Sequence, residues 1–151
     1  LLYAFLAAVG FAVIFNSPKT TLIKAGINGS IGWIVFALSK DIFSSNVVAS
    51  FVAALTVGIV GEVFAKIFKK PSTAFIIPGI IPLVPGAGIY YTMLALTKQS
   101  FLSAAESGSQ TLLVSISLAS GIVISSSLNR AIVNFIEAKK MEKRREILKE
   151  E

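Results

Sequence analysis

Five long stretches of this chain carry no charged residue, and this feature limits its fold more than any other. The stretches are 15 to 27 residues long and cover 1–18, 25–39, 42–61, 71–97 and 107–129. A helix that crosses a lipid bilayer needs about 20 consecutive, mostly apolar residues. Only 15% of the 151 residues are charged, whereas a soluble domain usually has about 25%. The sequence therefore predicts an all-α polytopic membrane protein with five transmembrane helices.

The loops between these stretches differ in basic charge. If successive loops alternate between the two sides of the membrane, one side receives 12 of the 14 Lys and Arg residues, and the other receives Lys40 and Lys98. The side that is rich in Lys and Arg is normally cytoplasmic. We therefore expect the N-terminus outside and the C-terminus in the cytoplasm, in the inner or plasma membrane.

The ends of the chain differ in character. The chain begins with Leu1 rather than Met, so we expect that some residues precede it; a cleaved signal peptide is the alternative to a first span, without the usual basic region. We expect a transmembrane domain over 1–136 and a cytoplasmic tail over 137–151. The tail, EAKKMEKRREILKEE, mixes both signs of charge, which predicts a solvated helix with i,i+4 pairs rather than a nucleic-acid-binding segment. Attraction of this tail to anionic lipid is compatible with the same charges.

The residue types that most enzymes need are missing from the sequence. It has no histidine and no cysteine, and Asp41 is its only aspartate. This excludes catalytic triads, thiolate nucleophiles, Cys/His metal sites and paired intramembrane aspartates. We expect no enzymatic activity, no metal ion and no cofactor.

A run of prolines and glycines interrupts the fourth stretch. Three prolines and three glycines lie between Pro78 and Gly88, and each proline inside a helix costs about 3 kcal/mol or more. The run predicts two half-helices, about 72–81 and 87–97, joined by an unwound segment over 82–88. Irregular backbone at membrane depth is tolerated only against protein or beside a water-filled cavity. A proline kink that serves packing alone is the alternative.

A broken helix of this kind suits the binding of a small anionic group. The first amides of the second half-helix have no intrahelical partner, and the helix dipole adds partial positive charge there. Secondary transporters use such half-helices to bind carboxylates. The residues that we predict to bind solute are Pro82, Pro85, Gly86, Ala87, Gly88, Tyr90, Tyr91 and, from the second stretch, Asn28.

A few other polar residues interrupt the predicted spans. Glu62 is the only acidic residue inside one, and we predict that it couples proton movement to transport together with Lys66. The alternative is a structural i,i+4 pair between the two side chains. For Asn28 the alternative role is packing among small residues. Packing is the favoured role of the face made by Ser117, Gly121 and Ser125, since small residues let helices approach closely.

Several of these segments resemble one family of transporters. The segments are Gly26-Ile27-Asn28-Gly29, Gly61-Glu62, Lys66, Lys70-Pro71 and, most specifically, IIPGIIPLVPGAGIYYTM at 76–93. They are similar to the threonine/serine exporter family, and in particular to the short membrane subunit of its two-polypeptide systems. The resemblance covers nearly the whole chain.

The resemblance implies a function and a partner. Members of this family export small hydroxy amino acids with the proton motive force, and some two-polypeptide systems are assigned to succinate-type dicarboxylates. The implied partner is a larger membrane subunit of the same family; a homo-oligomer stays open. The resemblance thus implies half of a proton-coupled exporter that works by alternating access, with a small carboxylate solute. A structural or assembly subunit without its own solute site is the alternative.

Overall fold

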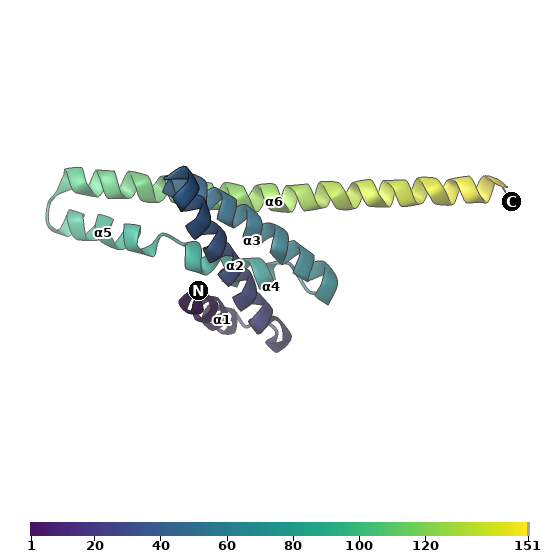
Figure 1. The fold of residues 1–151 in the computed structure, drawn as a ribbon, viewed down its shortest axis with the longest axis horizontal. Helices are drawn as coiled ribbons and strands as arrows, with labels where there is room; N and C mark the ends of the chain where they lie inside the picture. The colour runs from purple at the N-terminus through teal and green to yellow at the C-terminus, as the bar shows by residue number, and fades with distance from the viewer. Residues whose placement is uncertain (151) are drawn as a thin grey trace.

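The computed structural model describes the backbone of residues 1–150 and the side chains of residues 1–133 and 135. This part of the chain contains helices and no strands, which confirms the predicted all-α class (Figure 1). The elements are α1 Leu2–Ile14, η1 Lys19–Thr21, α2 Leu22–Phe43, α3 Asn46–Phe68, α4 Thr73–Ile80, η2 Ile81–Leu83, α5 Gly86–Thr97 and α6 Phe101–Glu150.

Three helical segments among the described residues are long and apolar enough to cross a membrane. They are Lys19–Phe43, Asn46–Phe68 and Phe101–Val133. Thr73–Leu83 and Gly86–Thr97 pass the same test together, but they are bent by 50° relative to each other. Helix α1 is apolar but has only 13 residues. The structure thus gives three or four candidate spans, and the count of five stays a prediction.

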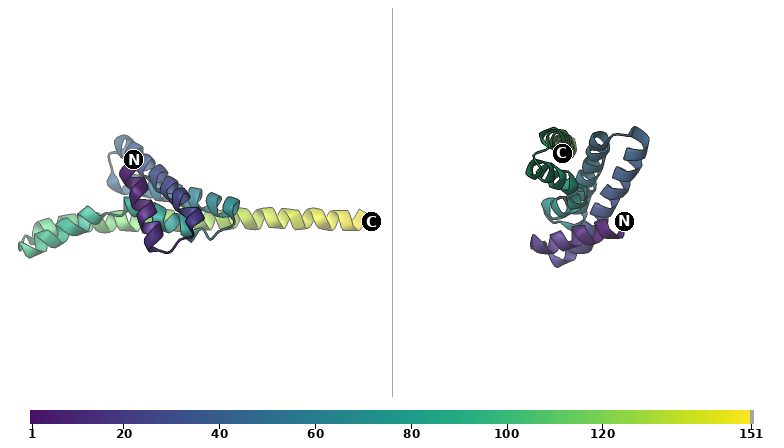
Figure 2. Two further views of the ribbon diagram at one scale, coloured as in Figure 1. Left: turned by 90° about the horizontal axis from the view of Figure 1, so that it is seen from below. Right: turned by 90° about the vertical axis from the view of Figure 1, so that its left-hand side faces the viewer.

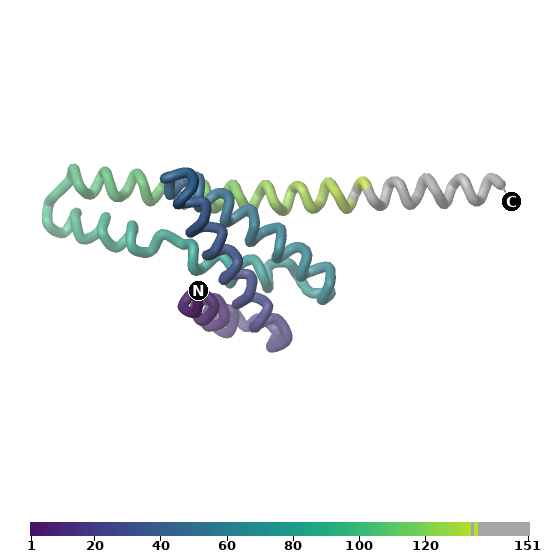
Figure 3. Tube along the Cα trace, in the orientation of Figure 1, coloured from purple at the N-terminus to yellow at the C-terminus, as the bar shows by residue number. Residues whose placement is uncertain are grey.

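Short turns with left-handed residues join the first long helices. Helix α2 ends at Ser44, which has φ 49°, and its N–H donates to the carbonyl of Lys40. Ser45 then caps α3, because its side-chain oxygen accepts from the amide of Val48 at 3.5 Å. Helix α3 ends in the same way as α2, at Lys69 with φ 52°. The two-residue turn between α2 and α3 produces an antiparallel hairpin (Figure 3).

Helices α3 and α6, in contrast, run parallel. A Cβ on Gly58 would overlap the side chain of Ser125, and one on Gly121 would lie 2.9 Å from the Cβ of Ala54. Four residues further along α3, Glu62 is hydrogen-bonded to a residue 67 positions later. From one contact to the next, the residue numbers increase in both helices. The two helices therefore have the same direction. The predicted small-residue face of α6 is therefore a packing surface, as we expected for Ser125 and Gly121.

The buried core is small, as is expected of a protein that is surrounded by lipid. Its buried cluster consists of Ala53, Ala54, Val57, Leu83, Val114 and Leu118. Helix α1 contributes alanines spaced four residues apart, Ala4, Ala8 and Ala12, all buried. Many large apolar side chains stay exposed, among them Leu102 at 85%. In water such exposure would promote aggregation, so these side chains suit a membrane-embedded surface.

Both ends of α6 extend beyond the α2–α3 hairpin. Figure 2 shows that α5 and the start of α6 project together beyond the α2–α3 hairpin, and α5 has no buried residue. In the other direction the backbone of α6 continues as one helix to Glu150. The predicted boundary between 136 and 137 is therefore not marked by a break in the helix. The charge pairs that we predicted in the tail lie outside the described side chains.

Candidate functional site

The helix is interrupted where the prolines predict it. Helix α4 ends at Ile80, a 3₁₀ turn covers Ile81–Leu83, and α5 begins at Gly86. Val84 is extended, with φ −62° and ψ 131°, and Pro85 precedes the helix with ψ 59°. We call residues 81–85 the break. It is shorter than the predicted 82–88, because Gly86, Ala87 and Gly88 already form the first turn of α5.

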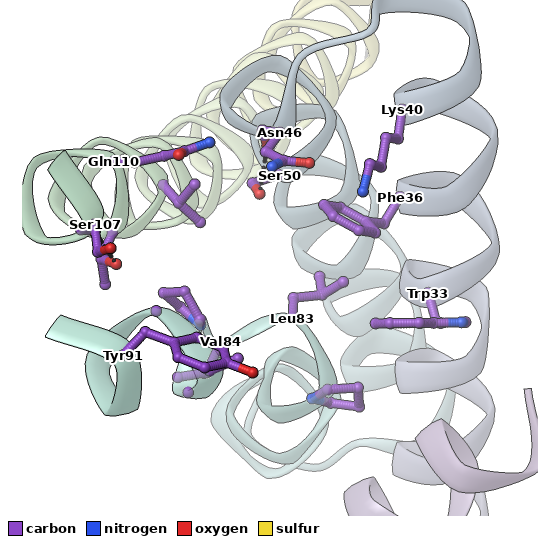
Figure 4. Close-up of a pocket in the computed structure, with 17 residues that line it drawn as sticks. Trp33, Phe36, Lys40, Asn46, Ser50, Leu83, Val84, Tyr91, Ser107 and Gln110 are labelled. Atoms are coloured by element: carbon purple, nitrogen blue, oxygen red, sulfur yellow. Dashed lines mark hydrogen bonds between the residues drawn. The ribbon is translucent and has the colours of Figure 1, made fainter. Parts of the chain in front are cut away.

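A cavity of about 520 Å³ lies against the break (Figure 4). Its floor is formed by the break and the first turn of α5. Its walls come from three other helices. The residues that line it are Trp33, Phe36 and Lys40 of α2; Asn46 and Ser50 of α3; Pro82, Leu83, Val84, Pro85, Gly86, Ala87, Gly88 and Tyr91 at the break and on α5; and Ser107, Gln110, Thr111 and Val114 of α6. The cavity therefore lies where the α2–α3 hairpin, the break with α5, and α6 meet.

Six of the eight predicted solute-binding residues line this cavity. These are Pro82, Pro85, Gly86, Ala87, Gly88 and Tyr91. Tyr90 does not line it and is 62% exposed. Asn28 does not line it either. The amides of Ala87 and Gly88, in the first turn of α5, precede the first intrahelical bond, which runs from Ile89 to Pro85. An anionic group in the cavity can therefore accept hydrogen bonds from them.

The cavity also contains polar residues that the sequence analysis did not single out. Ser50 is buried, and its hydroxyl donates to the carbonyl of Asn46 at 2.7 Å. Gln110 and Ser107 face them from α6 (Figure 4). Lys40 is the only charged residue in the lining. Lys40 lies at the end of α2, near the start of α3 and opposite the prolines. This position depends on how the helices pack, which the sequence pattern does not indicate.

Asn28 is fully buried at the contact of α2, α3 and α4. Its amide nitrogen donates to the carbonyls of Val57 at 3.1 Å and Phe75 at 3.2 Å. Two glycines leave room for it, since a Cβ on Gly61 or Gly79 would lie 3.3 or 2.8 Å from that nitrogen. Its Oδ1 has no hydrogen-bond partner. Asn28 thus holds α4 against the α2–α3 hairpin beside the cavity rather than in it.

Glu62 and Lys66 lie away from the cavity. The Glu62 carboxylate accepts a hydrogen bond from the amide of Asn129 at 2.8 Å, so its partner is on α6 rather than one turn further along α3. Lys66 is exposed. Glu62 is twelve residues from Ser50 of the cavity, about 18 Å along a helix. The structure therefore separates the predicted proton site from the predicted solute site.

Aromatic residues pack the region around Glu62 and Asn28. Phe75 is fully buried, and its ring centroid lies 5.8 Å from that of Phe64 and 6.3 Å from that of Phe68. The Lys24 ammonium lies 3.6 Å from the Phe68 ring centroid and donates to the carbonyl of Thr20 at 2.9 Å. Aromatic side chains thus pack this end of the helices, whereas the cavity lies at the other end of the α2–α3 hairpin.

The cavity can accept a small polar solute. One wall and the floor are apolar, and a few hydroxyls, amides and one ammonium converge on its interior, which is typical of small-molecule sites. Within the described residues, no group of three or more acidic, histidine or cysteine side chains can hold a metal ion.

Comparison with known proteins agrees with this architecture. Residues 1–128 match the model of a family described as "Threonine/Serine exporter, ThrE". The chain belongs to the threonine/serine exporter family. Family membership and the long apolar helices together indicate a multi-pass membrane protein.

The similarity extends to an uncharacterized protein of Haemophilus influenzae. It is 31% identical over 98 residues, which are 65% of this chain and 33% of that protein. The chain therefore spans about a third of the length of this relative. No solved structure matches the chain.

Proposed function

We propose that this threonine/serine exporter family member is a membrane subunit of a secondary exporter and binds its solute in the cavity at the break. The solute is threonine, serine or a related small carboxylate such as a dicarboxylate. The observation that carries the proposal is the cavity itself, because its floor consists of the residues that the Pro/Gly run predicted to bind solute. The first amides of α5 and the polar side chains that line the cavity would hold the polar groups of the solute.

The parallel course of α3 and α6 supports a broken span rather than a re-entrant loop. Helix α6 can run parallel to α3 only if the segment between them returns to the side of the membrane on which α3 began. We therefore propose that α4 and α5 together cross the membrane once. Counting α1 as a further span gives the five crossings that we propose, with the N-terminus outside and the C-terminus in the cytoplasm.

In this orientation the cavity opens to the outside, and the cytoplasmic end is closed. The contacts that close it are the hydrogen bonds of Asn28, the packing of Phe64, Phe68 and Phe75, and the Lys24–Phe68 contact. Aromatic pairs and exposed cation–π contacts contribute about 0.5–1.5 kcal/mol each. Contacts of this size can form and break in a two-state equilibrium of a few kcal/mol, as alternating access requires.

We propose Glu62, with Lys66 nearby, as the proton-coupling group. Its carboxylate lies at the α3–α6 contact and is half-buried, so its protonation changes the charge at a helix interface. An acidic group inside a span is a functional candidate by default. Since Glu62 does not line the cavity, the coupling acts through helix packing rather than through direct contact with solute.

We further propose a larger membrane subunit of the same family as the partner, with a homo-oligomer as the alternative assembly. The unburied helix α5 and the exposed Phe101 and Leu102 offer apolar surface that lipid or a partner can cover.

One observation favours a second function, a structural subunit without its own solute site. Asn28 and Glu62 make their hydrogen bonds to neighbouring helices, away from the cavity. In that case the solute site would belong to the partner, and the cavity at the break would be filled by lipid or by the partner.

Gly86→Leu separates the two functions. No atom lies within 4 Å of a Cβ placed on Gly86, so the larger side chain can enter the cavity without disturbing the fold. We expect export from proteoliposomes containing both subunits to fall at least about tenfold, because the side chain fills the solute site.

Gly10→Leu is the matched control, because a Cβ on Gly10 of α1 also meets nothing within 4 Å. It should export at the wild-type rate. Normal export by Gly86→Leu would favour the structural subunit.

A further inference from the structure

We propose that Lys40 binds the carboxylate of the solute and makes the cavity selective for anionic groups. This inference rests on the proposed solute site and assigns a residue to it. Lys40 is the only charged side chain among the residues that line the cavity. In Figure 4 its side chain extends from α2 towards Phe36, and its nitrogen ends next to the Phe36 ring in this view.

The helical register explains why Lys40 reaches this place. Helix α2 continues to Phe43, past the end of the uncharged stretch, so Lys40 is still on the helix. Trp33, Phe36 and Lys40 are spaced by three and four residues and therefore lie on one face. All three line the cavity. The aliphatic stem of Lys40 can pack along Phe36 while its ammonium stays in the polar part of the cavity.

A comparison with Lys24 indicates that the Lys40 ammonium is available to a ligand. The Lys24 ammonium donates to the Thr20 carbonyl and lies over the Phe68 ring. Among the described residues, the Lys40 ammonium has no comparable hydrogen-bond, ion-pair or aromatic partner. A carboxylate in the cavity would provide one, and hydrogen bonds between charged groups are roughly twice as strong as neutral ones.

The lining contains no acidic residue to balance Lys40. The ammonium of an amino acid would therefore meet only neutral acceptors, such as the side-chain oxygens of Asn46, Ser50 and Gln110. The cavity thus discriminates by the carboxylate, and a solute of the same size without one should bind poorly. A basic residue in the last turn of a helix also stabilises the helix through its dipole. The test must therefore separate an effect of Lys40 on solute binding from an effect on protein stability.

The test measures solute binding by calorimetry on the purified complex of both subunits in detergent, with threonine, serine, succinate and threoninamide as probes. Threoninamide keeps the hydroxyl and ammonium of threonine but lacks its carboxylate. We expect the wild type to bind at least one of the three acids and to bind threoninamide at least about tenfold more weakly than threonine or not at all.

Lys40→Met should weaken the binding of the acids at least about tenfold, and Lys40→Arg should retain most of it because the charge is kept. Lys98→Met is the matched control, because Lys98 is the other basic residue of the predicted outer loops and does not line the cavity. A role limited to the helix dipole would lower the melting temperature of Lys40→Met and leave its affinity unchanged.

Each result decides a different question. If the wild type binds acids and Lys40→Met binds them equally well, the role of Lys40 is refuted while the proposed function stands. If the wild-type complex binds none of the acids, both the proposed function and the role of Lys40 are refuted.

Discussion

The polar side chains of this protein differ in whether neighbouring residues provide them with hydrogen-bond partners. Asn28 donates two hydrogen bonds to backbone carbonyls, but its side-chain oxygen has no donor. The cost of burying this oxygen offsets part of the stabilisation that the two hydrogen bonds provide. Glu62 accepts a hydrogen bond from Asn129, whereas Lys40 lines the cavity. Only the last of these is placed to contact a solute directly.

Glu62→Gln tests the proposed proton role at this scale. The glutamine oxygen can accept the same hydrogen bond from Asn129, so we expect the fold and the assembly to survive. Export driven by a pH gradient should fall at least about tenfold, because glutamine cannot bind and release a proton.

Counterflow of labelled solute without a pH gradient is the control for intact binding and should persist. Wild-type export under the gradient would remove the proton role from Glu62.

The sequence could predict the role of a residue when that role depends on its own helix, and could not when the role depends on a residue far away in the sequence. The prolines and glycines of the break act on their own helix, so the sequence predicted six cavity residues, Pro82 and Gly86 among them. Lys40 and Ser50 acquire their roles from the packing of α2 and α3 against the break. Asn129, the partner of Glu62, is 67 residues away from it, and no local pattern links the two.

At the scale of elements, close contacts between small residues decide which helices pair. Gly58 faces Ser125, Gly121 faces Ala54, and Gly88 of α5 faces Thr111 of α6. The four-residue spacing of small side chains on α6 predicted a packing face, but it did not indicate that α3 is the partner or that the two helices are parallel. The break could be predicted to within a few residues, because proline acts through its own missing amide.

A side-chain exchange between α3 and α6 tests this contact. A Cβ on Gly58 would overlap Ser125, so Gly58→Ala should destabilise the protein by about 1–3 kcal/mol. Adding Ser125→Gly removes the side chain that is overlapped and should restore most of the loss. Thermal unfolding in detergent of both single variants and the double variant gives the coupling between them. Additive losses would contradict the contact.

At the scale of the whole molecule, the direction of the helices determines on which side of the membrane the cavity opens. Helix α3 runs from the cavity at Asn46 and Ser50 towards the basic turn at Lys69 and Lys70. The positive-inside rule assigns the basic turn to the cytoplasm. In the proposed topology the cavity therefore faces the outside, and the end packed by Phe75 faces the cytoplasm.

Cysteine labelling tests this orientation, since the natural chain has no cysteine. In intact spheroplasts, a membrane-impermeant thiol reagent should label Gln110→Cys in the cavity from outside. It should not label Lys69→Cys until the membrane is opened. The reverse pattern would place the cavity on the cytoplasmic side and invert the proposed topology.

The central claim is that solute binds in the cavity at the break, and the fluorescence of Trp33 tests it most directly. Trp33 is the only tryptophan of the chain and lines the cavity, so with a partner subunit whose tryptophans are replaced by phenylalanine its emission is the only tryptophan signal. Trp33 also lines a smaller pocket beside Tyr3, and Gly86→Leu distinguishes the two because Gly86 lines only the cavity at the break. We predict a saturable change in emission with threonine, serine or succinate, and none in Gly86→Leu. An unchanged emission with every acid, in a preparation that exports one of them, would contradict the claim.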